Sequence, residues 1–196
     1  ANLVPLDKVI YALRDVTGTT ESIPLIVSSI MSKKIACGAK YIVIDIKCGE
    51  GALIKTKRDA EILSKWLIDI GAHFNRKIKT IITDMDEPLS TCIGNALEVK
   101  EAIEVLKGKE NNLEKVSIEV AAELISMYKD ISLKEAAKLA KQTLKDNSAY
   151  QAFEKWIANQ NGDLSKLKVS KNILELKSSK NGTVKHISAL ACGKLS

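Results

Sequence analysis

The sequence predicts an α/β fold, because two apolar runs typical of buried strands are separated by a stretch with helical periodicity. The runs "YIVIDIK" at 41–47 and "KTIITDM" at 79–85 are rich in β-branched residues, as expected for strands that are covered on both faces. The helical stretch at 57–74 follows Thr56, a residue type that caps helices. A right-handed crossover would make the strands parallel and bring their carboxyl ends to one edge, where α/β proteins bind ligands.

Two helices are expected before the first strand. The first covers 7–13 and opens at Asp7, and the second covers 22–37, with Thr20 or Ser22 as its cap. A helical segment therefore precedes the sheet.

Four further helices are expected after the second strand, at 94–107, 112–128, 132–145 and 148–160. Ser132 and Ser148 are expected to cap the last two. The runs 172–177 and 183–188, joined by the turn "SSKNG", predict a β-hairpin. We place a domain boundary in the polar stretch 159–166, where βα alternation changes to ββ. Two strands and one hairpin are too few for complete domains, so we expect a segment of a longer protein.

The composition limits the class of function. The chain has 196 residues, of which 45% are hydrophobic, enough to bury a core. It has no apolar run of roughly 18 residues and no signal-peptide pattern, and its four cysteines lack CxxC spacing, so we expect a cytoplasmic protein without a zinc site. The net charge of +6 is spread among acids, and aromatic residues make up 4%. These values favour an anionic small substrate over nucleic acid as partner.

The second helix carries a polar strip on an otherwise apolar sequence. Ser29 and Lys33 are four residues apart and share one face. They could form a binding site, or the serine could be a small packing residue while the lysine stabilises the helix end through the macrodipole. Arg14 also has a structural interpretation, as an exposed arginine after a helix. On spacing alone, the structural readings are favoured.

Acidic residues gather at two places that could bind metal. Three follow the second strand: Asp84, Asp86 and Glu87. They could hold a divalent cation, although acids that cap turns are the commoner case. Glu98 and Glu101 share one face of the next helix, and a solvated face is the default interpretation.

Four motifs appear in order along the chain: "YALRDVTGTTESIPLIVSSIMSKK", "DIKCGEGA", "TDMDEPL" and "GNALEVKEAIEVLKG". In sequence and spacing they resemble the pyrimidine-nucleoside phosphorylase and thymidine phosphorylase family, specifically to about residue 108 and more loosely beyond. The resemblance covers the central and C-terminal part of such an enzyme, without the N-terminal half that holds phosphate. It implies that 1–37 is the second segment of an α domain, that 38–150 is part of an α/β domain, and that 151–196 begins a C-terminal α+β domain.

The resemblance also implies site residues. Arg14 in "YALRDVT", with Ser29 and Lys33 in "SSIMSKK", would bind the pyrimidine, and the arginine and the lysine would also act in catalysis. A monovalent cation, expected to be potassium, would be held by the main-chain carbonyls of Leu89 and Cys92 and by the carboxylate of Glu101. Phosphate would be the co-substrate, and the acids after the second strand would not be metal ligands.

The activity that the resemblance implies is phosphorolysis of pyrimidine nucleosides in pyrimidine salvage. Thymidine and deoxyuridine, with uridine as a further candidate substrate, would give the free base and α-(deoxy)ribose-1-phosphate. The enzyme would be a pentosyltransferase, a homodimer through its α domain, with no nucleic-acid or membrane partner. Two alternatives stay open: an anthranilate-type phosphoribosyltransferase, which uses magnesium, and a non-catalytic folded fragment without a phosphate site. We expect the parent enzyme to be active and the isolated 196-residue chain to be inactive.

Overall fold

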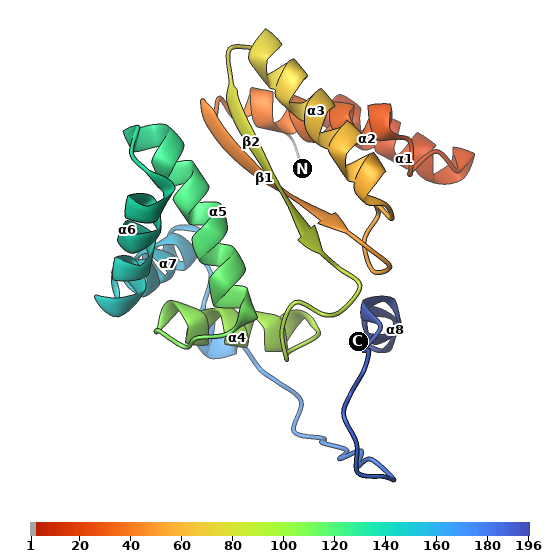
Figure 1. Cartoon of the computed structure of the whole chain (residues 1–196), viewed down its shortest axis with the longest axis vertical. Helices are drawn as coiled ribbons and strands as arrows, with labels where there is room; N and C mark the ends of the chain where they lie inside the picture. The colour runs from red at the N-terminus through yellow and green to blue at the C-terminus, as the bar shows by residue number, and fades with distance from the viewer. Residues whose placement is uncertain (1–2) are drawn as a thin grey trace.

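The computed structural model describes residues 3–196 (Figure 1). The N-terminal part contains α1 (Pro5–Thr17), α2 (Ile23–Ala36), β1 (Tyr41–Cys48), α3 (Lys57–His73) and β2 (Lys77–Asp84). After it come α4 (Asn95–Leu106), α5 (Asn112–Lys129), α6 (Leu133–Lys145), α7 (Ser148–Asn159), the short 3₁₀ turn η1 (Leu164–Lys166) and α8 (Ala189–Leu195). The predicted α/β class is confirmed. No helix within residues 3–196 is long and apolar enough to cross a membrane.

The two strands form a parallel pair, as the βαβ pattern predicts. Their register runs from Tyr41 opposite Lys77 to Cys48 opposite Asp84. The contact continues past the strands, because the amide of Met85 donates to the carbonyl of Cys48 at 2.8 Å. The carboxyl ends of β1 and β2 therefore lie together at one edge of the sheet.

Helices cover the sheet in two layers. In Figure 1, α2 and α3 lie on one side of the strands, while α5, with α6 and α7 behind it, lies on the other. The core lies mainly in the first layer and consists of apolar side chains from α2, β1, the loop after β1, α3 and β2: Ile26, Val27, Met31, Ile42, Ile46, Ile54, Ala60, Leu63, Leu67 and Ile78. The opposite face of the sheet is more polar, since Lys79 forms an ion pair at 2.6 Å with Glu123 on α5. The helix α2 thus shares its core with the sheet.

Of the predicted helix caps Thr56, Ser132 and Ser148, the first two are confirmed. Thr56 accepts a hydrogen bond from an amide in the first turn of α3, and Ser132 forms a reciprocal capping box with Glu135. The prediction for Ser148 is wrong, because this residue is the first of α7 and the cap is Asn147 at φ 64°. Asparagine adopts this left-handed conformation more readily than most residues, so it can serve as the cap. The helix therefore begins at Ser148 itself, one residue earlier than it would if Ser148 were the cap.

The N-terminal helices begin close to where the sequence places them. The helix α1 begins at Pro5 rather than at Asp7, because proline suits the first helical position and the acid lies in the first turn. The cap of α2 is Ser22, although its side chain makes no capping hydrogen bond.

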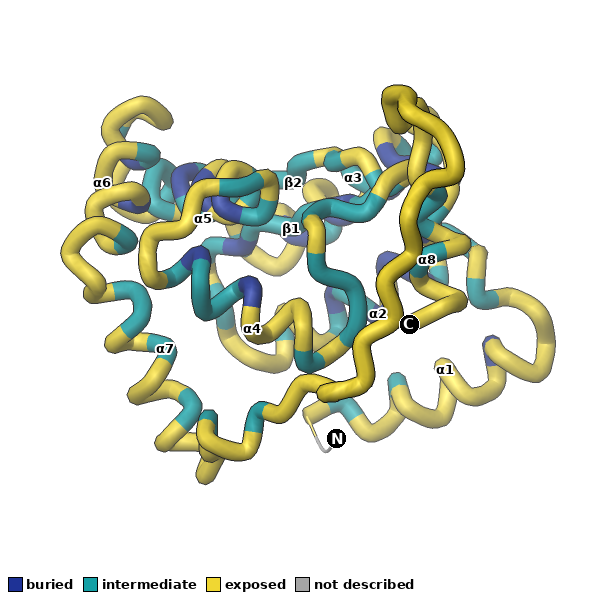
Figure 2. The backbone as a smooth tube through the Cα atoms, turned by 90° about the horizontal axis from the view of Figure 1, so that it is seen from below, coloured by how far each residue is buried: buried dark blue, intermediate teal, exposed yellow. Residues whose placement is uncertain are grey.

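The predicted β-hairpin at 172–177 and 183–188 is wrong for this chain. Residues 167–188 contain no strand, and Figure 2 shows this segment as exposed along most of its length. Ile173, Leu174 and Leu176 are 84–89% exposed. A two-stranded hairpin without a sheet or helix to cover its apolar side chains is marginally stable in water. The domain boundary at 159–166 stays a prediction.

A close approach between α3 and β2 generates the first prediction. A Cβ atom added at Gly71 would lie 2.3 Å from Cδ1 of the buried Ile78. Overpacking of this kind costs about 1–3 kcal/mol, and the higher helix propensity of alanine offsets about 1 kcal/mol of it. Gly71→Ala should therefore lower the free energy of unfolding by up to about 2 kcal/mol, measured by urea denaturation.

Gly193→Ala is the matched control, because Gly193 is also helical but a Cβ there meets nothing within 4 Å. This variant should be as stable as the unsubstituted protein or slightly more so. Equal stability of the two variants would show that the helix and the strand have room for a methyl group.

Candidate functional site

Ser29 and Lys33 meet on α2, as their four-residue spacing predicts. The ammonium of Lys33 donates to the hydroxyl of Ser29 at 2.8 Å and to its main-chain carbonyl at 3.1 Å. A third contact, at 2.5 Å, joins it to the carboxylate of Asp7 on α1. An ammonium has three protons, so these contacts can occupy all of them and tie α1 to α2. Sequence reasoning identified Asp7 only as a helix opener, because no local pattern links it to a lysine 26 residues away.

The carboxylate of Asp7 is the centre of this cluster. Its hydrogen bond to Lys33 holds the pKa of Asp7 below the usual range, against the smaller opposing effect of burial. The hydroxyl of Ser29 and the positive charge of Arg14 lower this pKa further. The structure therefore brings Ser29 and Lys33 together beside an acid that the sequence did not single out, while Arg14 acts on that acid only through its charge.

Arg14 is buried, with 3% of its surface exposed, which contradicts its interpretation as an exposed arginine. Its terminal nitrogens donate to the main-chain carbonyls of Thr20 and, at 3.4 Å, of Leu25. The guanidinium also lies over the ring of Tyr11, 4.9 Å from the centroid. Within residues 3–196 it has no carboxylate partner at salt-bridge distance, and its Nε has no hydrogen-bond acceptor. A buried donor without an acceptor is destabilising, so this group can gain from a ligand that accepts a hydrogen bond.

A pocket of about 640 Å³ adjoins the cluster. Asp7, Tyr11 and Lys33 line it, and Arg14 and Ser29 do not. A ligand there would contact Lys33 directly. It would reach Arg14 only if the guanidinium left its carbonyl partners.

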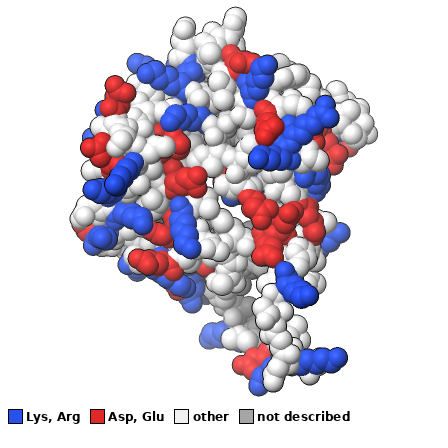
Figure 3. Space-filling view, in the orientation of Figure 1, with Lys and Arg blue, Asp and Glu red and all other residues white. Residues whose placement is uncertain are grey.

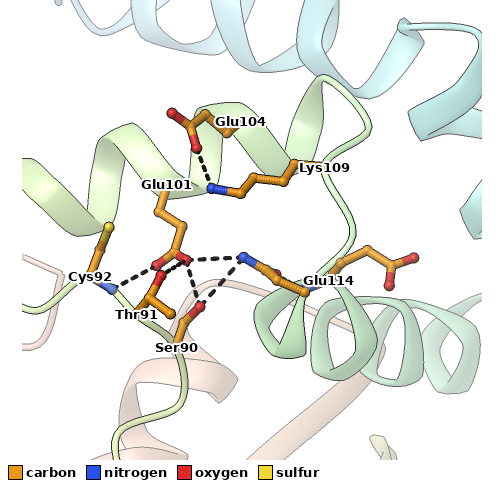
Figure 4. A network of polar contacts seen from close by, with 8 residues as sticks. Ser90, Thr91, Cys92, Glu101, Glu104, Lys109 and Glu114 are labelled. Carbon is orange, nitrogen blue, oxygen red and sulfur yellow. Dashed lines mark hydrogen bonds and ion pairs between the residues drawn. The ribbon is translucent and has the colours of Figure 1, made fainter.

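A second cluster surrounds Glu101 on α4 (Figure 4). Glu101 is 2% exposed, so the expectation of a solvated face is wrong for this residue. One carboxylate oxygen, Oε1, accepts hydrogen bonds from Ser90 at 2.6 Å, from Thr91 at 3.1 Å and from the amide of Asn111 at 3.0 Å. The other oxygen, Oε2, accepts from the main-chain N–H of Cys92 at 3.3 Å. The loop before α4 therefore folds back over the helix and covers this side chain.

The carboxylate of Glu101 remains ionised although it is buried. Burial alone would raise its pKa, but the hydrogen bonds from Ser90, Thr91 and Cys92 together lower the pKa below the usual range. Lys109 contributes only at longer range, because it pairs with Glu104 at 2.7 Å. No residue among 3–196 forms an ion pair with Glu101, so a negative charge is held by neutral donors.

The residues present fit a monovalent cation at this place. Leu89, Cys92 and Glu101 line one pocket of about 630 Å³ at the carboxyl edge of the sheet. Among residues 3–196, no donor is recorded for the main-chain carbonyls of Leu89 and Cys92. Carbonyl and carboxylate oxygens are the ligands that hard cations prefer, and a single buried carboxylate matches a single positive charge. The structure thus brings the three predicted cation ligands to one pocket.

The acids after β2 belong to turns. The carboxylate of Asp86 accepts from the amide of Glu50 at 2.7 Å, and that of Asp84 accepts from the amide of Asp86 at 3.0 Å. Figure 3 shows an acidic group near the carboxyl ends of the strands, while elsewhere on the visible face both signs are interspersed. Within the described part of the chain no three His, Cys, Asp or Glu side chains are grouped as a metal site. The turn interpretation of these acids therefore agrees with the structure.

Comparison with known proteins places the chain in a family. Residues 1–150 match the family described as "Glycosyl transferase family, a/b domain". The chain belongs to this family. A pyrimidine-nucleoside phosphorylase of Geobacillus stearothermophilus is 47% identical over 200 residues, which cover 98% of the chain and 46% of that protein. A protein of the same name from Bacillus subtilis is 47% identical over 166 residues, covering 84% of the chain and 38% of the relative. This glycosyl transferase chain thus spans about half the length of the relatives it matches.

The ion pair between Asp7 and Lys33 generates the second prediction. Asp7→Asn keeps the size of the side chain and removes its charge. Since the folded-state pKa of Asp7 is lowered, the pair stabilises the fold above the usual aspartate range; this contribution begins to fall below about pH 4 and is lost as the pH falls through the lowered folded-state pKa. The variant should lose up to about 1 kcal/mol of unfolding free energy at neutral pH and much less at about pH 2, measured by urea denaturation.

Asp15→Asn is its control, because Asp15 is an exposed acid on the same helix without a recorded ion pair among residues 3–196. Its stability should follow that of the unsubstituted protein at both pH values. A loss in Asp7→Asn that did not change with pH would contradict the ionic origin of the effect.

Proposed function

We propose that the protein to which this chain belongs is a pyrimidine-nucleoside phosphorylase. The observation that carries the proposal is the cluster of Arg14, Ser29 and Lys33 around Asp7, in a chain 47% identical to proteins of that name. The cluster offers forked donors, a hydroxyl and an ammonium, which suit the carbonyl and ring N–H groups of a pyrimidine.

The reaction transfers the sugar from the base to phosphate. A phosphate oxygen attacks the anomeric carbon while the bond to the base breaks, so negative charge grows on the pyrimidine. Lys33 and Arg14 stabilise this charge, and Ser29 donates to or accepts from the ring edge. Preorganised donors of this kind contribute about 3–4 kcal/mol each in a site that excludes water. Displacement in one step inverts the anomeric carbon and yields an α-sugar-1-phosphate.

The charge of the cluster adds a requirement to this mechanism. Lys33 is already paired with Asp7, so the two together are close to neutral. The positive charge without a carboxylate partner is that of Arg14, which is buried behind two carbonyls. Binding of the base therefore has to draw Arg14 away from Thr20 and Leu25, or bring the base to the unpartnered Nε.

Thymidine, deoxyuridine and uridine are the proposed nucleosides, phosphate is the co-substrate, and the free base and sugar-1-phosphate are the products. In this proposal the chain contributes the residues that bind the base. The part of the protein that corresponds to the unmatched part of the relatives contributes the residues that bind phosphate. The proposed assembly is a cytoplasmic homodimer. Its subunits contact each other through the α domain, to which α1 and α2 belong.

Potassium is the proposed cation at the second cluster, held by the carbonyls of Leu89 and Cys92 and by the carboxylate of Glu101. When bound, it would neutralise the buried carboxylate and fix the loop between β2 and α4. The proposed chemical step does not use the cation, so its proposed role is structural. It would fix the loop between β2 and α4 at the carboxyl edge of the sheet.

An activity assay tests the proposal. The whole protein should release thymine or uracil from nucleosides only when phosphate is present. Lys33→Ala and Arg14→Ala should each lower kcat/KM by about 10²–10³-fold, because each removes a donor to the leaving base. Lys34→Ala is the control, since Lys34 is the next residue of α2 and is exposed; it should retain activity.

Three results would contradict this function. They are no phosphate-dependent release, full activity in both variants, or a requirement for magnesium and a pyrophosphorylated sugar, which would favour a phosphoribosyltransferase. The isolated 196-residue chain should be inactive in the same assay.

Thermal unfolding tests the cation separately. Potassium at ten times its Kd should stabilise the whole protein by about 1.4 kcal/mol, which raises Tm by about 1–3 °C relative to tetramethylammonium at equal ionic strength. Glu101→Gln should abolish this difference because it removes the charged ligand. Glu104→Gln, which changes an acid one turn away on α4, should keep it. A potassium effect that survives Glu101→Gln would rule out the proposed site.

A further inference from the structure

Asn111 connects the buried carboxylate of Glu101 to the first turn of α5. Its amide nitrogen donates to Oε1 of Glu101 at 3.0 Å and lies 3.4 Å from the hydroxyl of Ser90. Its amide oxygen accepts from the main-chain N–H of Glu114 at 2.9 Å, which caps the N-terminus of α5. One side chain therefore bonds both to the buried carboxylate and to the first turn of the next helix.

The two oxygens of Glu101 are unequally occupied. Oε1 accepts from Ser90, Thr91 and Asn111, all at 3.1 Å or less. Among residues 3–196, Oε2 has a single donor, the N–H of Cys92 at 3.3 Å. A carboxylate oxygen has two lone pairs in its plane, so Oε1 is saturated by protein and Oε2 keeps room for another partner. The free oxygen lies on the side of Cys92, whose carbonyl is a proposed cation ligand.

The two contacts that residue 111 makes suit the chemistry of an asparagine. A carboxamide carries a donor and an acceptor on the same short side chain, so it can cap a helix and hold Oε1 at once. An aspartate could cap but has no donor for Glu101, and a serine could cap but is too short to reach the carboxylate.

We propose that Asn111 is a positioning residue that fixes the rotation of the Glu101 carboxylate so that Oε2 faces the cation. The inference rests on the proposed cation site and adds to it a link to α5. Because both interactions share one amide, ordering of the carboxylate by the cation and ordering of the first turn of α5 support each other. The helix α5 in turn packs on the sheet, where Glu123 pairs with Lys79 at 2.6 Å.

The test uses Asn111→Ser in the whole protein. Serine retains the capping oxygen, so Tm without potassium should stay within about 3 °C of the unsubstituted protein, as expected for a cap exchange of a few tenths to 1 kcal/mol. Loss of the donor to Oε1 should raise the potassium concentration for half-maximal thermal stabilisation by about tenfold, as second ligand-shell changes typically do. The half-maximal potassium concentration for phosphorolysis should rise in parallel, and saturating potassium should restore the rate.

Asn112→Ser is the matched control. Asn112 is the exposed neighbour of Asn111, and its recorded side-chain contact is to Lys115 at 3.5 Å. Its potassium response should superimpose on that of the unsubstituted protein. Asn111→Ala should show the same shift in potassium response as Asn111→Ser, together with a lower Tm because it also removes the cap.

The outcomes separate this inference from the cation site itself. A potassium response of Asn111→Ser within twofold of the unsubstituted protein, while Glu101→Gln has lost its response, overturns the positioning role and leaves the site intact. A normal response in Glu101→Gln overturns both. A tenfold shift in Asn111→Ser that Asn112→Ser does not share supports the inference.

Discussion

Because β1 and β2 run parallel, the chain must cross back over the sheet through α3, and both strands deliver their next loops to the same edge. The loop after β1 and the loop after β2 meet there, where Gly51 donates to the carbonyl of Met85 at 2.9 Å. From this edge the chain enters α4, which carries Glu101 back beneath the loop that precedes it (Figure 4). The position of the cluster around Glu101 is therefore a consequence of strand direction, whereas the cluster around Asp7 depends on packing of α1 against α2 on another side of the molecule.

The two clusters hold a carboxylate in different ways, and the difference decides what each can bind. Asp7 is neutralised by Lys33, so its pair leaves little net charge for a ligand. Glu101 is held by hydroxyl and amide donors that stabilise its charge without cancelling it. Arg14 presents the opposite case, a buried positive charge held by carbonyls. A buried charge without an ion-pair partner is costly, so a ligand of opposite charge at Arg14 or at Glu101 would stabilise the protein.

Patterns of nearby residues in the sequence predicted the features that depend on nearby residues, namely the strands and the pairing of side chains on one helix. The β-branched runs identified both strands, and four-residue spacing placed Ser29 beside Lys33. The spacing of Asp7 and Lys33 along the sequence does not predict their contact, because they lie on two different helices joined by a turn. Glu101 was expected in solvent because helical periodicity cannot show that Ser90 and its neighbours fold over α4. The hairpin was predicted from alternation, but strands also need a surface to cover them, and the exposed leucines Leu174 and Leu176 lack one in this chain.

The last helix shows how a long exposed segment can still have a defined end. Residues 168–187 are exposed, yet the amide of Ala189 donates to the carbonyl of Asp86 at 2.9 Å, and the hydroxyl of Ser188 donates to Glu50. A Cβ at Gly51 would lie 2.7 Å from that of Ala189, so α8 rests directly on backbone that only glycine leaves open. The helix then adds residues to the wall of the pocket that contains Glu101. The shape of the pocket around Glu101 thus depends on α8 at the end of the chain, and on strand-end loops whose acids accept hydrogen bonds from main-chain N–H groups.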